Sequence, residues 1–233
     1  MNVIILAAGL GTRLGRPYPK TLTPLADGRS ILRQQLDHLR ETFGEPARIT
    51  IVVGFKMGLI MEAAANDAAF VYNEVYDQTN TSKSLLKALL LAPPGGALWL
   101  NGDVVFVPGL LEELRPYLES ERSFVAVNTG SVAEEEVKYT LDADGYIGEL
   151  SKQVVGGLGE AVGINYISAA DRDTLVEHLI AADDSDYFER GIETAIAEAG
   201  LRVAAVDIGK YGCVEVDFEP DLVRANELRT GPR

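Results

Sequence analysis

The fold is decided by the stretch VIILAAGLGTRLGRPYPK, residues 3–20. Its apolar start, residues 3–6, predicts a short buried strand, and the small residues that follow predict a loop at the end of that strand. Glycines at positions 9 and 11 allow backbone N–H groups to approach and wrap a phosphate chain. Arg13 and Lys20 add two cations placed to neutralise a triphosphate. The stretch therefore predicts an anion-binding strand and loop; the alternative is that both cations are merely exposed loop charges.

This loop lacks the marks of two common phosphate-binding motifs. The dinucleotide fingerprint requires a third glycine where Leu14 stands, and an acidic residue at the end of the next strand, where Gly54 stands. The Walker loop requires a Gly-Lys-Ser/Thr triplet after the first glycine, and none follows. A nicotinamide oxidoreductase is therefore disfavoured.

Apolar runs that predict strands alternate with helical spacings from residue 30 to residue 127. Ser30 and Ser82 are the expected N-caps of two of these helices. The expected strands lie at 49–53, 70–72, 97–100 and 124–127, and the expected helices at 31–43, 57–65, 83–91 and 108–118. This order predicts an α/β fold, Rossmann-like and doubly wound, with a mostly parallel sheet.

The pattern changes after residue 127. Runs at 137–141 and 146–150, joined at Ala143-Asp144-Gly145, predict a hairpin. Further strands are expected at 162–167, 203–206 and 214–216, and further helices at 170–182, 186–199 and 219–228. We therefore expect one domain, 1–233, with a small antiparallel insertion.

Composition excludes several classes of function. The 233 residues carry a formal charge of −14, which disfavours binding to nucleic acid. The charge is distributed unevenly, with +2 over residues 1–100 and −16 over residues 101–233. The acidic excess of the second half indicates either a solvated acidic surface or a set of functional carboxylates. A single cysteine, Cys213, and two histidines exclude a disulfide framework and Cys- or His-rich metal centres. With no run of about 20 apolar residues and no basic leader, we expect a cytoplasmic protein without membrane contact.

Two aspartates form the clearest metal-binding pair. Asp103 and Asp217 each follow a short apolar run, so both are expected at the carboxyl edge of the sheet, where open α/β folds bind ligands. Mg²⁺ prefers one or two carboxylates together with phosphate oxygens and water. Glu215 alternates to the same side as Asp217 and joins the site as a weaker candidate. The alternative for Asp103 is an ordinary turn-forming residue.

The loop motif Leu-Ala-Ala-Gly-x-Gly-x-Arg, with Pro-Lys after it, resembles the signature of the sugar-1-phosphate nucleotidyltransferase superfamily. The likeness extends over nearly the whole chain. Segments that are similar to the subgroup containing phosphocholine cytidylyltransferases are Asn73-x-x-Tyr76, Asn80-Thr81-x-x-Ser84-Leu85 and Glu215-Val216-Asp217 with Asp221-Leu222.

The resemblance implies a fold of the nucleotide-diphospho-sugar transferase type, with an NTP-binding half at 1–130 and an acceptor and metal half at 131–233. The implied reaction joins an NTP, with CTP favoured, to a small phosphorylated or phosphonate acceptor and releases pyrophosphate. The partners that the resemblance implies are the NTP, the acceptor and Mg²⁺, with Asp103 and Asp217 as the metal ligands. The resemblance is also compatible with a homo-oligomer. The implied catalytic residues are Arg13, Lys20 and Lys152. The implied nucleotide-binding residues are Leu6, Ala7, Ala8, Gly9, Gly11, Thr12, Asn80, Ser84 and Gly102, and the acceptor-binding residues Lys83, Glu160, Tyr166 and Glu215.

Two rival functions stay open. One is a sugar-1-phosphate uridylyl-, guanylyl- or thymidylyltransferase, because the pyrimidine bases differ by only a few hydrogen bonds. The other is a nucleotide-binding regulator that has lost catalysis. Such a regulator would lack a cation or a metal carboxylate, whereas Arg13, Lys20, Asp103 and Asp217 are all present.

The acceptor segment departs from that of phosphocholine enzymes. A quaternary ammonium binds over aromatic rings, yet Lys83 stands where an aromatic residue would suit choline, and Ile167 follows Tyr166 where a tryptophan would. A lysine there would repel choline, so we expect a neutral polyol phosphate, or an anionic phosphate or phosphonate, to outperform phosphocholine. The alternative is that Lys83 points to solvent and that Tyr166, Tyr187 and Phe188 form the cage.

Overall fold

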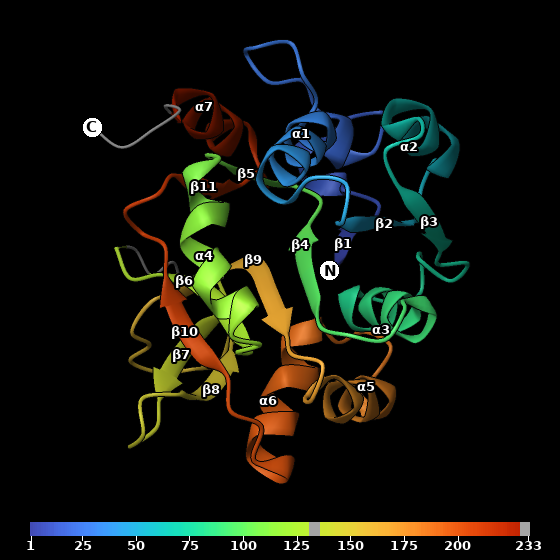
Figure 1. Ribbon diagram of the computed structural model, residues 1–233. Helices are drawn as coiled ribbons and strands as arrows, with labels where there is room; N and C mark the ends of the chain where they lie inside the picture. Colours follow the sequence, from blue (N-terminus) through green and yellow to red (C-terminus); the bar gives the residue numbers. More distant parts are fainter. Residues whose placement is uncertain (131–135, 229–233) are drawn as a thin grey trace.

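The computed structural model describes residues 1–130 and 136–228. Its main element is a mixed sheet with β1 (Asn2–Ala7) near the centre, hydrogen-bonded in parallel to β2 (Arg48–Val53) and β4 (Ala97–Asn101) (Figure 1). The register pairs Ile5 with Ile51 on one side and with Leu100 on the other. The strand order is β10-β6-β9-β4-β1-β2-β3, with β3 at Ala69–Tyr72, β6 at Phe124–Asn128, β9 at Glu160–Ile167 and β10 at Ala204–Asp207.

Helices cover both faces of this sheet, which confirms the doubly wound α/β fold. Each face of the sheet has its own hydrophobic core, because successive side chains of β1 point to opposite faces. Val3 and Ile5 pack on one face with α1 (Ile31–Phe43), α2 (Met57–Ala64) and α4 (Gly109–Glu119). Ile4 and Leu6 pack on the other face with α3 (Thr81–Leu91), α5 (Arg172–Ala181) and α6 (Phe188–Ala199) (Figure 1). In the described residues, no helix has the length and apolar character needed to cross a membrane.

The expected parallel order is interrupted by one strand. β9 lies between β4 and β6 and is antiparallel to both, so β6 does not pair with β4. The predicted hairpin forms as β7 (Lys138–Leu141) and β8 (Ile147–Ser151) and joins the sheet where Lys138 pairs with Glu160. Packing of β8 against α6 fixes this hairpin beside the carboxyl edge of the sheet.

Two local expectations are corrected. Asn80, not Ser82, caps α3: its side chain accepts a hydrogen bond from the backbone N–H of Thr81, while Ser82 is buried within the helix. The other correction concerns Asp217, which was expected at the edge of the main sheet. The short strand β5 (Val104–Phe106), absent from the sequence expectation, instead pairs antiparallel with β11 (Cys213–Glu215) in a separate ribbon that α7 (Glu219–Glu227) follows.

Candidate active site

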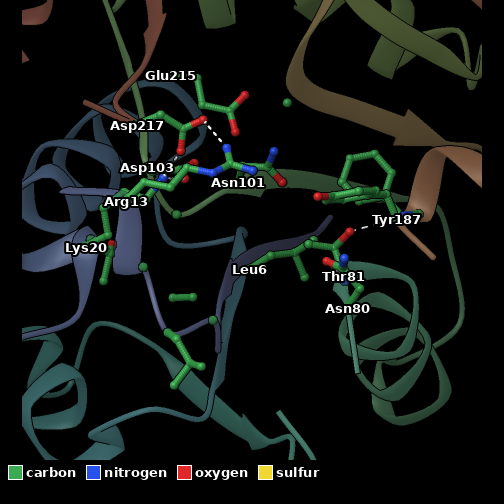
Figure 2. Close-up of a pocket in the computed structure, with 18 of the residues that line it drawn as sticks. Leu6, Arg13, Lys20, Asn80, Thr81, Asn101, Asp103, Tyr187, Glu215 and Asp217 are labelled. Carbon is green, nitrogen blue, oxygen red and sulfur yellow. Dashed lines mark hydrogen bonds and ion pairs between the residues drawn. The ribbon is translucent and has the colours of Figure 1, made fainter. Parts of the chain in front are cut away.

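A cavity of about 540 Å³ opens beside the carboxyl ends of β1 and β4. Figure 2 shows Arg13, Lys20, Asp103, Glu215 and Asp217 gathered at one end of it. Asn80, Thr81 and Tyr187 lie at the other end, with Leu6 between the two groups (Figure 2). The cavity therefore has the carboxylate pair with Arg13 and Lys20 at one end, and Lys152 beside the Tyr187 ring at the other.

The glycine loop after β1 forms one wall of the cavity. Gly11 has φ +59°, and a Cβ on it would lie 2.9 Å from the Cβ of Lys20, so both its backbone conformation and its neighbour require glycine. A short 3₁₀ turn, Thr12–Leu14, follows and buries Leu14 in a small core beside β5 and β11. This anchor holds Arg13 at the mouth of the cavity.

The turn that carries Asp103 is held from two sides. The backbone N–H of Gly102 donates to the carbonyl oxygen of Leu6 at 2.9 Å, and a Cβ on Gly102 would lie 2.8 Å from that oxygen. Gln35, buried on α1, donates through Nε2 to the carbonyl oxygens of Asn101 and Val104 at 2.9 and 2.7 Å. Gln35 is thus a positioning residue that motif reasoning did not identify.

Lys20 links the two aspartates. Its Nζ lies 2.6 Å from Asp103 Oδ2 and 2.5 Å from Asp217 Oδ1, and Arg13 Nη1 lies 2.7 Å from Asp217 Oδ2. The side chain of Lys20 is 13% exposed, whereas that of Arg13 is 50% exposed. Asp221, in the first turn of α7, accepts hydrogen bonds from the backbone N–H groups of Asp217 and Phe218 and fixes that end of the cluster.

The electrostatics of this cluster follow from burial and pairing. Burial raises the pKa of the Asp217 carboxyl, but Lys20 and Arg13 outweigh burial, so the net pKa lies below the usual range. Burial lowers the pKa of Lys20, and its two aspartate partners raise it well above the ordinary value. For Glu215, burial, followed by the charges of Asp103 and Asp217, outweighs the opposing effect of Lys20 and raises its pKa well above the ordinary value.

The same cluster fits a divalent cation. Oxygens of Asp103 and Asp217 both lie within 2.6 Å of one ammonium nitrogen, so they already converge on a single cation position. The second oxygen of Asp103 is buried without a hydrogen-bond partner. Two carboxylates are the protein ligands that Mg²⁺ commonly takes beside phosphate oxygens and water. Across residues 1–130 and 136–228, no group of three or more His, Cys, Asp or Glu is arranged to hold a metal.

The structure brings most of the expected nucleotide-binding residues to this cavity and leaves two outside its lining. Those that line the cavity are Leu6, Ala7, Gly9, Gly11, Thr12, Asn80 and Gly102. Ala8 lies behind the loop, where its carbonyl oxygen accepts from the N–H of Phe55 at 3.0 Å. Ser84 is buried on α3, where its hydroxyl accepts from Asn73 Nδ2 at 3.1 Å.

The expected acceptor residues divide between the cavity and other parts of the fold. Lys152, from the turn after β8, and Glu215 line the cavity. Lys83 does not: its Nζ donates to the carbonyl oxygens of Leu179 and Ala182, because the last carbonyls of α5 attract an ammonium group.

Tyr166 and Glu160 also lie outside the lining of the cavity. Tyr166 is 3% exposed and stacks on Phe124, with 5.9 Å between ring centroids. Glu160 begins β9, opposite Asn128. Its charge, added to burial, raises the pKa of Glu136, which does line the cavity.

Sequence reasoning missed two residues that line the acceptor side, Glu136 and Glu189. Tyr187 and Phe188, which the sequence suggested only as members of an alternative aromatic cage, also line the cavity. Glu189 lies in the first turn of α6 next to the buried Phe188, and only its place on the apolar face of that helix distinguishes it from the many other acids of the chain.

Comparison with known proteins gives the chain its relatives. A family model described as the MobA-like NTP transferase domain matches residues 3–200. The chain is 28% identical over 253 residues to the CMP-5'-(3-aminopropyl)phosphonate synthase of Streptomyces rubellomurinus, an alignment covering 100% of this chain and 39% of that protein. It is 42% identical over 106 residues to the Bifunctional protein GlmU of Cupriavidus taiwanensis, covering 45% of this chain and 22% of that protein. The chain thus spans well under half the length of these two relatives.

Solved structures share the fold over almost the entire chain. The inositol-1-phosphate CTP transferase from T. maritima superposes with a TM-score of 0.78 at 15% identity, covering 100% of this chain and 97% of that one. The CTP:phosphocholine cytidylyltransferase from Streptococcus pneumoniae (LicC) superposes with a TM-score of 0.76 at 21% identity, covering 97% of both chains. At these identities the likeness is one of fold.

Proposed function

The chain belongs to the MobA-like NTP transferase domain family, and from that premise we propose that it joins an NTP, with CTP preferred, to a small phosphonate or phosphate and releases pyrophosphate. The observation that carries this proposal is the cluster of Arg13, Lys20, Asp103 and Asp217, which lines the same cavity as the glycine loop. A strand-end loop with cations and a carboxylate pair suits a nucleoside triphosphate.

The proposed reaction is an in-line displacement at the α-phosphorus. An oxygen of the acceptor phosphonate or phosphate forms a bond to this phosphorus while the bond to the β-phosphate bridging oxygen breaks, and pyrophosphate leaves with both electrons of that bond. Such a reaction requires positioning and charge neutralisation rather than a covalent enzyme intermediate. Backbone N–H groups of the glycine loop would bind the triphosphate, and Arg13 and Lys20 would neutralise charge on the departing pyrophosphate.

Lys152 would hold the attacking acceptor. Its side chain lines the cavity, with Nζ 4.9 Å from the centroid of the Tyr187 ring. Asp103 and Asp217 would hold Mg²⁺, which when bound supplies positive charge to the phosphate oxygens. The charge of the described lining supports a bound cation: seven Asp and Glu residues line the cavity against four Lys and Arg residues. A triphosphate would meet net repulsion there without added positive charge.

The preference for CTP and for a phosphonate is supported by the relatives. One curated relative, which aligns with the whole chain, is named for a CMP-linked phosphonate product. Two of the solved structures of the same fold are titled as CTP enzymes. The sequence-based reason for disfavouring phosphocholine, a lysine at position 83 in the acceptor pocket, does not apply, because Lys83 caps α5.

A second candidate function is a sugar-1-phosphate nucleotidyltransferase that uses another NTP. It is favoured by the fold shared with a UDP-glucose pyrophosphorylase, at a TM-score of 0.74. A pyrophosphate-release assay with four NTPs, each paired with phosphonates, alcohol phosphates and sugar 1-phosphates, separates the two. We expect release with CTP and a phosphonate or alcohol phosphate. Release only with UTP, GTP or TTP and a sugar phosphate would establish the second function, and no release from any pair would refute both.

A further inference from the structure

The acceptor side of the cavity contains a buried carboxylate that the proposed reaction does not use. Glu189 is 8% exposed, yet it lines both the active-site cavity and a neighbouring cavity of about 510 Å³. Its Oε2 is buried without a hydrogen-bond partner. A buried carboxylate oxygen that lacks a partner is costly to the folded state. Its presence in a cavity wall therefore indicates that a ligand supplies the missing donor.

The charges around Glu189 favour a cationic donor. Lys152 and Tyr187 line the same two cavities, and Lys152 Nζ lies over the Tyr187 ring at 4.9 Å from its centroid. Glu136 adds a further carboxylate to the first cavity, whereas Glu193 in the second cavity is neutralised by its ion pair with Arg190 at 2.8 Å. Burial raises the pKa of Glu189 to about 7, Lys152 lowers it and Glu136 raises it. Apart from the paired Glu193 and Arg190, this part of the wall therefore presents Glu136 and Glu189 together with Lys152, and the attacking phosphonate would pair with Lys152.

We propose that the acceptor carries a protonated primary amine that donates hydrogen bonds to Glu189 while its phosphonate or phosphate group is bound at Lys152. The substrate class is thus an aminoalkyl phosphonate or aminoalkyl phosphate. This inference rests on the proposed function and specifies its acceptor.

The geometry favours a primary amine over a quaternary one. A primary ammonium has N–H donors for Oε2, whereas a trimethylammonium has none and depends on several ring faces. Tyr187 is 40% exposed, but Phe188 is 1% exposed and packs edge-on against Trp99 at 5.6 Å between centroids. Tyr166 lies outside the cavity lining. Of the aromatic cage considered as an alternative from the sequence, Tyr187 is therefore the one well-exposed ring, because Phe188 lines the cavity with little exposed surface and Tyr166 does not line it.

Shape-matched acceptors test the inference. Steady-state kcat/KM is measured with CTP and Mg²⁺ for 2-aminoethylphosphonate, its N,N,N-trimethyl derivative and propylphosphonate, in which a methyl group replaces the ammonium. Phosphoethanolamine, in a fourth arm, distinguishes a phosphate from a phosphonate source. A charge-assisted hydrogen bond in a buried site predicts that the wild type prefers the primary amine to both analogues by about 30-fold or more.

Variants then attribute the preference to Glu189. Glu189→Gln should reduce the preference for the amine over propylphosphonate to about fivefold or less, with propylphosphonate turnover and the KM for CTP within about twofold of wild type. Glu189→Asp, which keeps the charge one methylene further back, should retain part of the preference. Glu193→Gln, one turn along α6 in an ion pair with Arg190, is the matched control and should leave the preference unchanged.

Equal use of propylphosphonate and the amine by the wild type would overturn the inference, as would a Glu189→Gln variant that loses activity equally with all acceptors. If no acceptor releases pyrophosphate with any NTP, the proposed function is wrong. Calorimetric titration of 2-aminoethylphosphonate and propylphosphonate into wild type and Glu189→Gln then decides the amine site. Tighter binding of the amine to the wild type alone supports the site, and equal binding refutes it.

Discussion

Removal of Lys20 perturbs both the stability and the chemistry of the charged cluster. In Lys20→Ala the ammonium that lies 2.6 Å from Asp103 and 2.5 Å from Asp217 is lost. The two carboxylates are 17% and 19% exposed, and Glu215 beside them is half-buried, so several acids remain together in a poorly solvated site. Arg13 stays as the partner of Asp217 and compensates part of the loss.

The magnitude follows from that geometry. Breaking a fully buried ion pair by deleting one partner costs about 3–5 kcal/mol, and partial exposure together with Arg13 reduces our expectation to about 2–3 kcal/mol. For a chain of this size the melting temperature should fall by roughly 5–10 °C. The sequence places Lys20 on a loop, and from that position alone almost no change in stability is expected. Added Mg²⁺ should restore more stability to the variant than to the wild type, because the ion replaces the missing positive charge.

Differential scanning fluorimetry and steady-state kinetics measure the two effects. Because charge develops mainly in the transition state, Lys20→Ala should lower kcat by more than it raises the KM for the NTP. Lys87→Ala is the matched control, because Lys87 pairs with Glu74 at the surface and the loss of such a pair costs about 0–1 kcal/mol. A melting temperature and kcat for Lys20→Ala equal to those of the control would refute the reasoning.

Three further predictions concern other residues of the fold. Asp103→Asn and Asp217→Asn should each lower turnover by about a thousandfold or more without unfolding the protein, because the change is nearly isosteric but removes a carboxylate from the cation position; near-normal rates across a Mg²⁺ titration would contradict this. The stability of Glu189→Gln relative to wild type should increase as the pH rises. In the wild type the pKa of Glu189 is raised from 4.5 to about 7, so its contribution to folding is fully present below pH 4.5 and is lost as the pH rises through 7. The difference, read from urea unfolding at pH 4.5 and pH 8, should approach about 3 kcal/mol at the higher pH, and a pH-independent difference would disprove it. Lys83→Ala should lower the free energy of unfolding by about 1 kcal/mol and leave kcat/KM for every acceptor unchanged, because its ammonium caps α5; a change in the order of acceptors would return Lys83 to the acceptor site.

Most of the fold was predictable because its signals are local. The first strand and its glycine loop are one continuous stretch, and the amphipathic helices repeat their apolar residues at short spacing. β5 was missed because three residues are too few for a pattern, and its pairing with β11 joins Val104 to Glu215 across the chain. The insertion of β9 between β4 and β6 likewise depends on contacts between distant segments.

The candidate site likewise divides into residues with a local sequence signal and residues placed by contacts between distant segments. Arg13, Lys20, Asp103 and Asp217 were identified because each lies next to a loop or strand end whose position follows from the topology. Lys83 was assigned to the acceptor because its neighbours in sequence suggested it, but its partners are the carbonyls of α5, 96 to 99 residues away. Glu189 was missed for the converse reason: its burial beside Lys152 arises only when α6 packs against the hairpin.

The most direct test of nucleotidyl transfer is the ³¹P NMR spectrum of a reaction containing the protein, CTP, Mg²⁺ and a phosphonate acceptor. We predict that free pyrophosphate appears together with two mutually coupled resonances from a CMP–phosphonate anhydride, in equal amounts. Pyrophosphate accompanied only by CMP would identify hydrolysis instead of transfer and contradict the account. An unchanged CTP spectrum with this acceptor and with the phosphate acceptors would contradict it as well.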